Sequence, residues 1–469
     1  MSRTLPSPST PVPRLLASTG NDYNRTKRRG NSHSSIPSDS DREDLPVPEI
    51  LHTDSPNAGN FRHLLWSSDG TSLITTSADN TLRTFILPPD LLESPSSEEP
   101  YADRPASHHL GPYSSHLHPS PIYSSALSPY YTLALPETTL ILTSPSSLPI
   151  RLLSPFAPGI IATYPLVDPS TERWIAPHSI LFSIPYSNHA PNTGESVPEN
   201  SLHFLAGSRN QISLFDVSRN GSGPMTTLAT ASGNRKARRG GSFAMAGIVS
   251  CMSMSCEGIL AAATFSRGVG LYDAHGMGDT IGTWSLNNGE EGAGVTSVHW
   301  SKCGRYLVVA ERGSNGMGVW DIRGTGRRLA WLNGRNALTM QRLGIALGND
   351  WQGSYGQEHV YAGGTDGHVQ VWNDVGQKEG QLESDWCWRA HEDAVTGIGI
   401  HACGNVVATC SGSRHDVNNE QVSGDESPSK SENGAMCSPP GEGHYTAIDN
   451  SIQVWGLEDS TTANNERMA

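Results

Sequence analysis

The stretch VTSVHWSKCGRYLVVAERGSNGMGVWDIR, residues 295–323, holds the pattern that decides the fold. Apolar and polar residues alternate over 295–300, over 306–310 and again over 317–322, with turn residues between these segments. Alternation with a period of two predicts three short strands joined by tight turns. The stretch ends on the pair Trp320-Asp321. A sheet this small cannot bury either of its faces alone, so similar units must stand beside it.

The same arrangement recurs along the chain. Residues 61–87, FRHLLWSSDGTSLITTSADNTLRTFIL, match the first stretch element by element. A terminal tryptophan-aspartate pair is typical of WD repeats, in which four strands form one blade of a propeller. Turn glycines at 258, 304, 353 and 404 recur in steps of roughly 50 residues, close to the ~40–45 residues of a WD blade. The spacing gives seven candidate blades: 61–87, 122–153, 178–217, 247–274, 293–323, 336–374 and 391–457.

We therefore predict an all-β fold, a seven-bladed WD-repeat β-propeller whose closed ring removes free sheet edges. A second feature supports it: three aspartates each precede an aromatic residue by six positions, namely Asp79, Asp366 and Asp449. An aspartate in a tight turn accepts backbone hydrogen bonds and stabilises the hairpin. WD repeats place it in a structural Asp-His-Ser-Trp network, and His391 with Trp455 gives the fullest version here.

The segments outside the predicted strands have a different composition. Residues 1–57 are rich in Ser, Pro and charge, and they bury too little apolar surface to offset chain entropy, so we expect a disordered tail. The propeller is expected over 58–457. Within it, 88–120 is predicted to be a linker and 414–447 a disordered insert that splits the seventh blade. Residues 458–469 are expected to form a disordered C-terminal tail.

Composition limits the class of protein. The 469 residues carry a formal net charge of −14, which argues against a globally basic nucleic-acid binder but not against a local basic face. The seven cysteines form no C-x-x-C pair, and no apolar run has the ~20 residues of a membrane span. We expect a soluble intracellular protein without a membrane partner. The cluster Arg25-Thr26-Lys27-Arg28-Arg29 fits either a solvated tail or a nuclear-import signal.

The sequence contains no motif that indicates catalysis. It has no P-loop, no G-x-S-x-G elbow, no H-E-x-x-H and no dinucleotide-binding glycine pattern in a strand-to-helix context. Four histidines crowd one predicted linker but lack acidic partners, so we predict no metal site there: His108, His109, His116 and His118. We expect no catalytic residue, no cofactor and no small-molecule substrate. The function should lie in what the faces of the ring bind.

Two basic features stand out against the acidic background. One is a cluster on the connection into the fourth blade, which fits either a solvated loop or a contact with a phosphate backbone: Arg235, Lys236, Arg238 and Arg239. The other is a set of single arginines in or near turns at comparable blade positions: Arg209, Arg267, Arg312 and Arg414. Each alone is an ordinary surface residue. Together they would form a positive rim suited to RNA phosphates or to stacking on an unpaired base.

Several segments resemble one known family. They are Asn60-Phe61 through Gly70, Ser77-Ala78-Asp79-Asn80-Thr81-Leu82-Arg83 with Leu87-Pro88-Pro89, Gly247 to Cys251 with Gly270-Leu271-Tyr272, Trp320 to Arg323, Gln341-Arg342 and Ala408 to Gly412. Over about residues 60 to 457 the chain resembles the telomerase Cajal body protein family. The S-A-D-N-x-L-R and L-P-P segments are its most specific part. The second predicted blade is degenerate, and the entry to the fifth lacks a histidine.

The resemblance implies a non-catalytic nuclear scaffold that binds RNA. Its expected partners are a small nuclear or guide RNA, with telomerase RNA among the candidates, and ribonucleoprotein proteins. The ring is expected to be a monomer within a larger complex, in a Cajal-body-like nuclear compartment with a cytoplasmic pool as well. Arg342 joins the predicted RNA-binding set through the Gln341-Arg342 match. The alternative is a WD-repeat adaptor that joins proteins, in pre-mRNA splicing or another complex, without direct RNA binding.

Overall fold

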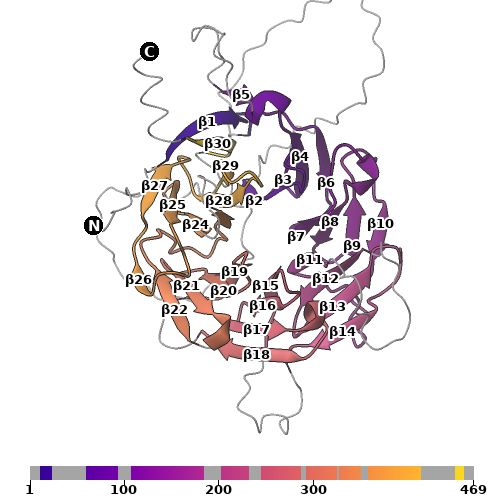
Figure 1. The fold of residues 1–469 in the computed structure, drawn as a ribbon. Coiled ribbons are helices and arrows are strands. Elements are labelled where there is room, and N and C mark those ends of the chain that lie inside the picture. The colour runs from indigo at the N-terminus through magenta and orange to yellow at the C-terminus, as the bar shows by residue number, and fades with distance from the viewer. Residues whose placement is uncertain are drawn as a thin grey trace, which may run out of the picture.

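Seven antiparallel sheets stand in a ring in the computed structural model of the chain (Figure 1). The colours in Figure 1 run around the ring in chain order, so each sheet is one blade. This confirms the predicted seven-bladed, all-β propeller. The structure describes residues 11–23, 60–92, 107–183, 202–231, 245–286, 292–324, 327–349, 358–413 and 449–458.

Blades one to six each contain four strands, numbered here from the centre of the ring outward. Blade one contains β2 (Phe61–Trp66), β3 (Ser72–Ser77), β4 (Thr81–Ile86) and β6 (Ser114–Leu117). Blade two contains β7 (Ile122–Leu127), β8 (Ile141–Pro145), β9 (Ile150–Leu153) and β10 (Ala162–Tyr164). Blade three contains β11 (Ser179–Ser183), β12 (His203–Ser208), β13 (Gln211–Asp216) and β14 (Thr226–Ala229).

The next three blades repeat the plan. Blade four contains β15 (Val249–Met254), β16 (Leu260–Thr264), β17 (Gly268–Tyr272) and β18 (Thr280–Ser285). Blade five contains β19 (Val295–Trp300), β20 (Tyr306–Glu311), β21 (Met317–Asp321) and β22 (Arg328–Leu332), with β26 (Gly380–Leu382) added in parallel outside β22. Blade six contains β23 (Ile345–Asn349), β24 (Glu358–Gly363), β25 (His368–Trp372) and β27 (Trp386–Arg389).

The seventh blade joins the two ends of the chain. It contains β28 (Val395–Ile400), β29 (Val406–Ser411), β30 (Ile452–Glu458), β1 (Val12–Ser18) and, in parallel outside β1, β5 (His108–His109). Strand β1 pairs with β30 in antiparallel register from Val12 opposite Glu458 to Ser18 opposite Gln453, with one irregularity near Ala17. In Figure 1 these two strands lie side by side at the outer edge of the blade. The N-terminal strand thus closes the ring.

This closure corrects the prediction that residues 1–57 are all disordered. Ala17 is completely buried, in one cluster with Phe61 and Phe85 of blade one and Val454 of blade seven. Beyond the strand, Thr19 exchanges backbone and side-chain hydrogen bonds with Ile452. A short apolar segment within a Ser/Pro-rich tail is invisible to average composition, and its ordering depends on a strand edge that only the folded seventh blade supplies.

The prediction that residues 88–120 are a linker is also wrong in part. Strand β6 within this range is the fourth strand of blade one, and β5 covers β1. The fourth strands of the other blades up to the sixth likewise lie outside the predicted blade ranges. These strands are outermost and half-exposed, so their sequences lack the apolar alternation that marks the inner three. The predicted insert at 414–447 and nearly all of the predicted tail at 458–469 lie outside the described residues.

The hydrogen-bond network predicted around His391 is confirmed. His391 Nδ1 lies 3.2 Å from Asp449 Oδ2, and its Nε2 lies 2.8 Å from Thr409 Oγ1. Trp455 Nε1 donates to the same hydroxyl at 3.1 Å. Burial of Asp449 opposes ionisation, but hydrogen bonds and the charge of His391, with a further bond from Ser451, hold the pKa of its carboxyl well below its usual range. Thr409 thus occupies the serine position of the network.

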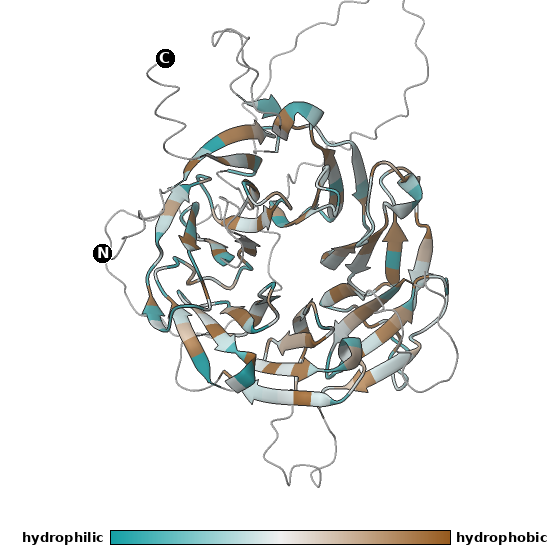
Figure 2. Ribbon diagram, viewed as in Figure 1, coloured by the Kyte–Doolittle hydropathy of each residue, from teal (hydrophilic) through white to brown (hydrophobic). Residues whose placement is uncertain are grey.

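Apolar strand faces hold neighbouring blades together. Figure 2 shows brown, hydrophobic segments recurring along the strands around the ring. Trp320 is one of the residues that join blades four and five, and its ring lies 6.4 Å from that of Trp284. Asp321 next to it is half-exposed. The Trp-Asp pair that marks the repeat in the sequence is therefore part of the scaffold.

Helices contribute little to this fold. The described ones are short 3-10 turns: η1 (Pro89–Leu92), η2 (Pro136–Thr138), η4 (Ala274–Gly276) and η5 (Ile322–Gly324). None of the helices in the described ranges has the length and apolar character that would let it cross a membrane.

The closing strand provides a stability test. We expect Ala17→Asp to lower the free energy of unfolding by at least ~3 kcal/mol, because it buries a carboxylate without a partner. Val12, on the same strand, is 41% exposed, so Val12→Asp should change stability by no more than ~0.5 kcal/mol. Urea unfolding of both variants measures the difference, and equal small effects would contradict a closing role for β1.

Candidate functional site

One face of the ring gathers the predicted arginines. In each blade the start of the first strand, the end of the second and the start of the third lie at the same end of the sheet, as pairing in blade five shows. This end also receives the connection from the preceding blade. We call it the connection face, and the other the opposite face. Arg209, Arg267, Arg312 and Arg342 all lie in turns or connections of the connection face.

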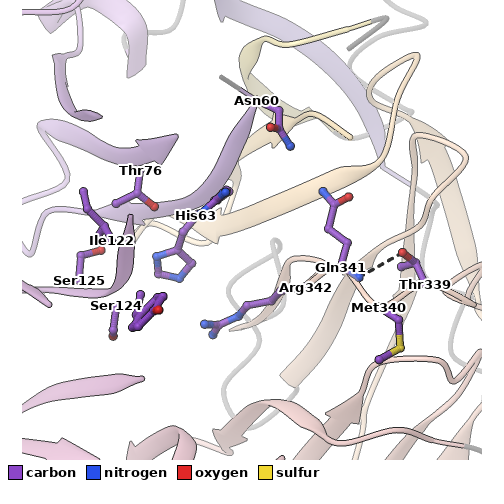
Figure 3. A pocket seen from close by; sticks show the side chains of 12 residues that line it. Asn60, His63, Thr76, Ile122, Ser124, Ser125, Thr339, Met340, Gln341 and Arg342 are labelled. Carbon is purple, nitrogen blue, oxygen red and sulfur yellow. Dashed lines mark hydrogen bonds between the residues drawn. The ribbon is translucent and has the colours of Figure 1, made fainter. Parts of the chain in front are cut away.

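A cavity of about 550 Å³ opens on this face beside the centre of the ring. Its walls come from β2, β7 and the connection into β23, and Figure 3 shows Arg342 reaching across toward His63 and Ser124. Arg342 is exposed to solvent, although protein surrounds it, and burial lowers the pKa of its guanidinium. An arginine in a protein stays protonated at neutral pH. A fixed positive charge therefore stands in the mouth of the channel.

The backbone around Arg342 is held firmly. Gln341 Nε2 donates to the carbonyl of Gly412 at 2.6 Å, and its backbone N–H donates to Thr339 Oγ1 at 3.1 Å, the bond drawn in Figure 3. Two residues after Arg342, a Cβ on Gly344 would come within 2.5 Å of the backbone nitrogen of Ile398. Only glycine allows this close approach of the two chains. The connection is thus pinned to blade seven on both sides of the arginine.

Two histidines near Arg342 stay uncharged. Burial lowers the pKa of His63 to about 3, and the charges of Arg342 and His299 lower it further. Burial and the charge of Arg342 lower the pKa of His299 to about 4. Both rings lie on innermost strands and are partly exposed. At neutral pH they offer one donor and one acceptor each without adding charge.

A second cavity of about 400 Å³ continues along the innermost strands of blades one to four. It shares His63 and Arg342 with the first cavity. The lining residues of both include no aspartate or glutamate, whereas the whole chain carries a net charge of −14. The mouth of the channel is therefore a locally cationic site with polar and aromatic walls. Such a site suits an anionic ligand with planar groups.

Arg267 has a structural partner. Its Nε and an Nη lie 2.7 and 2.9 Å from the two carboxylate oxygens of Glu311, and both side chains are mostly buried. This bidentate pair ties blade four to blade five. Arg267 was predicted to bind RNA, but its charge is already compensated inside the protein. It is the weakest member of the predicted set.

Arg312 is placed differently. Its Nε donates to the carbonyl of Ala293 at 3.0 Å, and its guanidinium lies over the ring of Phe265, 4.5 Å from the centroid. The side chain is partly exposed. It therefore presents a positive, planar group on the connection face. Arg323, at the far end of β21, lies on the opposite face and pairs with Asp321.

The remaining predicted RNA-binding residues lie outside the described residues: Arg235, Lys236, Arg238, Arg239 and Arg414. Their flanking strands run to the connection face, since 232–244 leads into blade four and 414–448 joins β29 to β30. As binding residues they stay predictions.

Sequence reasoning missed the residues that line the channel mouth. His63, His299 and Tyr123 lie on first strands of blades, where side chains that alternate with buried neighbours face the centre of the ring. A polar or aromatic residue at such a position was the available signal. Which of the seven innermost strands face one another across the mouth depends on the closed ring.

The histidine-rich linker shows no metal arrangement. His108 lies 3.7 Å from Asp90, and His109 lies 3.1 Å from Asp22. Within the described ranges, no group of three or more His, Cys, Asp or Glu side chains is arranged to hold a metal ion.

Comparison with known proteins gives the same type of fold. The family model described as "WD domain, G-beta repeat" matches residues 49–85. Telomerase Cajal body protein 1 of Rattus norvegicus is 27% identical over 354 residues, which are 74% of this chain and 58% of that protein. The Homo sapiens protein of the same name is 26% identical, over 74% of this chain and 56% of its own length. The aligned part thus covers less than two thirds of these relatives.

A protein with a different name is similarly close. "Guanine nucleotide-binding protein negative regulator 1" of Schizosaccharomyces pombe is 28% identical over 320 residues, which are 66% of this chain and 70% of that protein.

The Arg267–Glu311 pair should affect stability. We expect Arg267→Met to lower the free energy of unfolding by about 3 kcal/mol, because it leaves the Glu311 carboxylate mostly buried without its partner. The double variant Arg267→Met/Glu311→Gln should recover most of the loss. Chemical denaturation of the two variants measures this. Equal destabilisation in both would show that the pair is not the cause.

The neutral histidines should make stability depend on pH. Below pH ~6.5 the unfolded chain protonates these imidazoles, whereas folded His63 and His299 take up a proton only near pH 3 to 4. Stability should therefore fall as pH drops from about 6.5 to 4. Each histidine contributes at most ~1.4 kcal/mol per pH unit, and less where channel water reaches the ring. The double variant His63→Gln/His299→Gln should show a shallower slope in urea unfolding, and an unchanged slope would refute the assignment.

Proposed function

We propose that this WD-repeat propeller, which is related in sequence to telomerase Cajal body protein 1, is a non-catalytic nuclear scaffold that binds RNA on its connection face. One observation carries the proposal: the exposed guanidinium of Arg342 at the mouth of a channel whose lining lacks carboxylates. The chain as a whole is acidic, so a general attraction to polyanions is not expected. Binding would be confined to this local site.

The residues at the mouth suggest how RNA would be held. Arg342 would pair with a phosphate or with the edge of a base, since its planar fork of donors matches both. His63 and His299 would supply neutral hydrogen-bonding groups beside it. Arg312, and the basic residues of 235–239, would add contacts to the RNA backbone around the rim. Backbone contacts fix the position of the RNA, while the mouth of the channel selects an unpaired nucleotide.

The relatives suggest the biological setting. The rat and human proteins are named for telomerase and for the Cajal body. We propose that this chain binds a small nuclear or guide RNA, with telomerase RNA among the candidates, together with ribonucleoprotein proteins. It would help to localise or assemble such particles in a Cajal-body-like compartment of the nucleus.

The competing proposal is an adaptor that joins proteins without contacting RNA. The propeller fold serves many unrelated binders, so the fold does not choose between the two. Crosslinking in the native cells, followed by sequencing of the bound RNA, separates them. Enrichment of a defined set of small RNAs supports the scaffold proposal, whereas recovery of background RNA alone overturns it in favour of the adaptor.

Arg342 should be the main determinant of RNA affinity. We expect Arg342→Gln to weaken binding of a labelled 12-nucleotide single-stranded RNA by about tenfold, because a charged hydrogen bond contributes ~1.5–3 kcal/mol. The slope of log affinity against log salt should become shallower by ~0.7. Fluorescence anisotropy at several salt concentrations measures both quantities.

Arg305 provides the matched control. It is exposed in the turn between β19 and β20, on the opposite face of blade five. Arg305→Gln removes the same charge from the chain and should leave affinity within about twofold. Equal losses in the two variants would indicate a general charge effect and would count against a site at the channel mouth.

A further inference from the structure

Four side chains from four consecutive blades form a continuous stack on the connection face. The Tyr123 and His178 rings are stacked, with centroids 4.4 Å apart and an interplanar angle of 11°. His178 meets Phe265 edge to face, at 5.8 Å and 81°. The guanidinium of Arg312 covers the Phe265 ring at 4.5 Å. We call Tyr123, His178, Phe265 and Arg312 the aromatic ridge.

The ridge lies beside the two cavities at the channel mouth. Tyr123 lines the first cavity, together with Arg342, and is 41% exposed. His178 lines the second cavity. The ring of Tyr123 therefore presents one face to the first cavity, while His178 covers its other face. Tyr123 Oη is bonded to Ser146 Oγ at 2.9 Å, which fixes the orientation of the ring.

The members of the ridge do not serve the apolar packing between blades. None of its three rings belongs to the buried clusters that join neighbouring sheets. Burial lowers the pKa of His178, so this ring is neutral at pH 7 and acts as a flat surface rather than a cation. Large aromatic rings that are partly exposed and outside the core are typical of binding surfaces.

The two ends of the ridge are complementary to different parts of a nucleotide chain. At one end, the free face of Tyr123 lies in a cavity that also contains the charge of Arg342. At the other end, the guanidinium of Arg312 uses its Nε for Ala293 and rests on Phe265. The outer side of this planar group is suited to a base or a phosphate.

We infer that the aromatic ridge binds single-stranded RNA, with one unpaired base stacked on Tyr123 in the first cavity and another on the guanidinium of Arg312. This deepens the proposed function and rests on it. Paired bases in a duplex present no free faces, so the ridge selects single strands over double helices. Stacking tolerates any base, so the ridge contributes affinity for the single-stranded state, whereas the polar groups around Arg342 read the inserted base.

The test compares two RNA probes and four variants. The probes are a labelled 12-nucleotide unstructured RNA and the same strand annealed into a blunt duplex. The wild-type chain should bind the single strand at least tenfold more tightly. Tyr123→Ala should weaken single-strand binding by about tenfold, because a base stacked on an aromatic ring contributes roughly that much. Tyr123→Phe should retain most of the affinity, since it keeps the ring and removes only the hydroxyl.

Tyr130 and Arg312 complete the set. Tyr130 is 57% exposed in the turn after β7, on the opposite face of the same blade, so Tyr130→Ala should bind like the wild type. Arg312→Gln should weaken the single strand more than the duplex. Thermal unfolding of each variant identifies a loss caused by misfolding, and in that case Tyr123→Phe and Arg312→Gln still test the ridge.

The outcomes distinguish this inference from the proposed function. If the wild-type chain binds neither probe, both fail together. If Arg342→Gln weakens RNA binding but the Tyr123 and Arg312 variants do not, the ridge inference alone is overturned. The same holds if the duplex binds as tightly as the single strand, or if the ridge variants lose a co-purifying protein and keep RNA.

Discussion

A ring of separate sheets keeps its shape only if the last sheet is joined to the first, and pairing between β1 and β30 is that joint. Apolar faces hold neighbouring blades together but leave the ring free to open between blades seven and one. Strand β1 adds a ladder of backbone hydrogen bonds to blade seven and inserts Ala17 into the cluster it shares with Phe61 of blade one. One segment thus belongs to both sides of the seam.

The channel mouth exists because the seam is closed. Arg342 comes from the connection into blade six, His63 from blade one and Tyr123 from blade two, and they line one cavity only when the seventh blade bridges between them. The contact of Gln341 with Gly412 fastens this connection to blade seven. Distant parts of the chain therefore meet at one cationic site in an acidic protein. Closure and binding depend on the same joint.

The inner strands of the propeller could be predicted from the sequence, but the outer ones could not. The second and third strands of a blade are buried on both faces, so segments such as 306–310 are almost entirely apolar. The outermost strands, such as Ser114–Leu117, are half-exposed and read as loops. Strand β1 was hidden for another reason: a short apolar segment forms a strand only where a partner edge is present. Local pattern alone cannot reveal that edge.

The arginines show the same division. The repeat pattern alone determined that this chain forms a WD-type ring, and that Arg267 and Arg312 occupy comparable positions on one face of it. Only the tertiary structure decided their roles, because these depend on neighbours from other blades. Arg267 meets the carboxylate of Glu311 and is neutralised, whereas Arg312 meets the ring of Phe265 and keeps a free charge. A repeat specifies position from nearby residues, but charge and accessibility follow from residues that the folded ring brings from elsewhere in the chain.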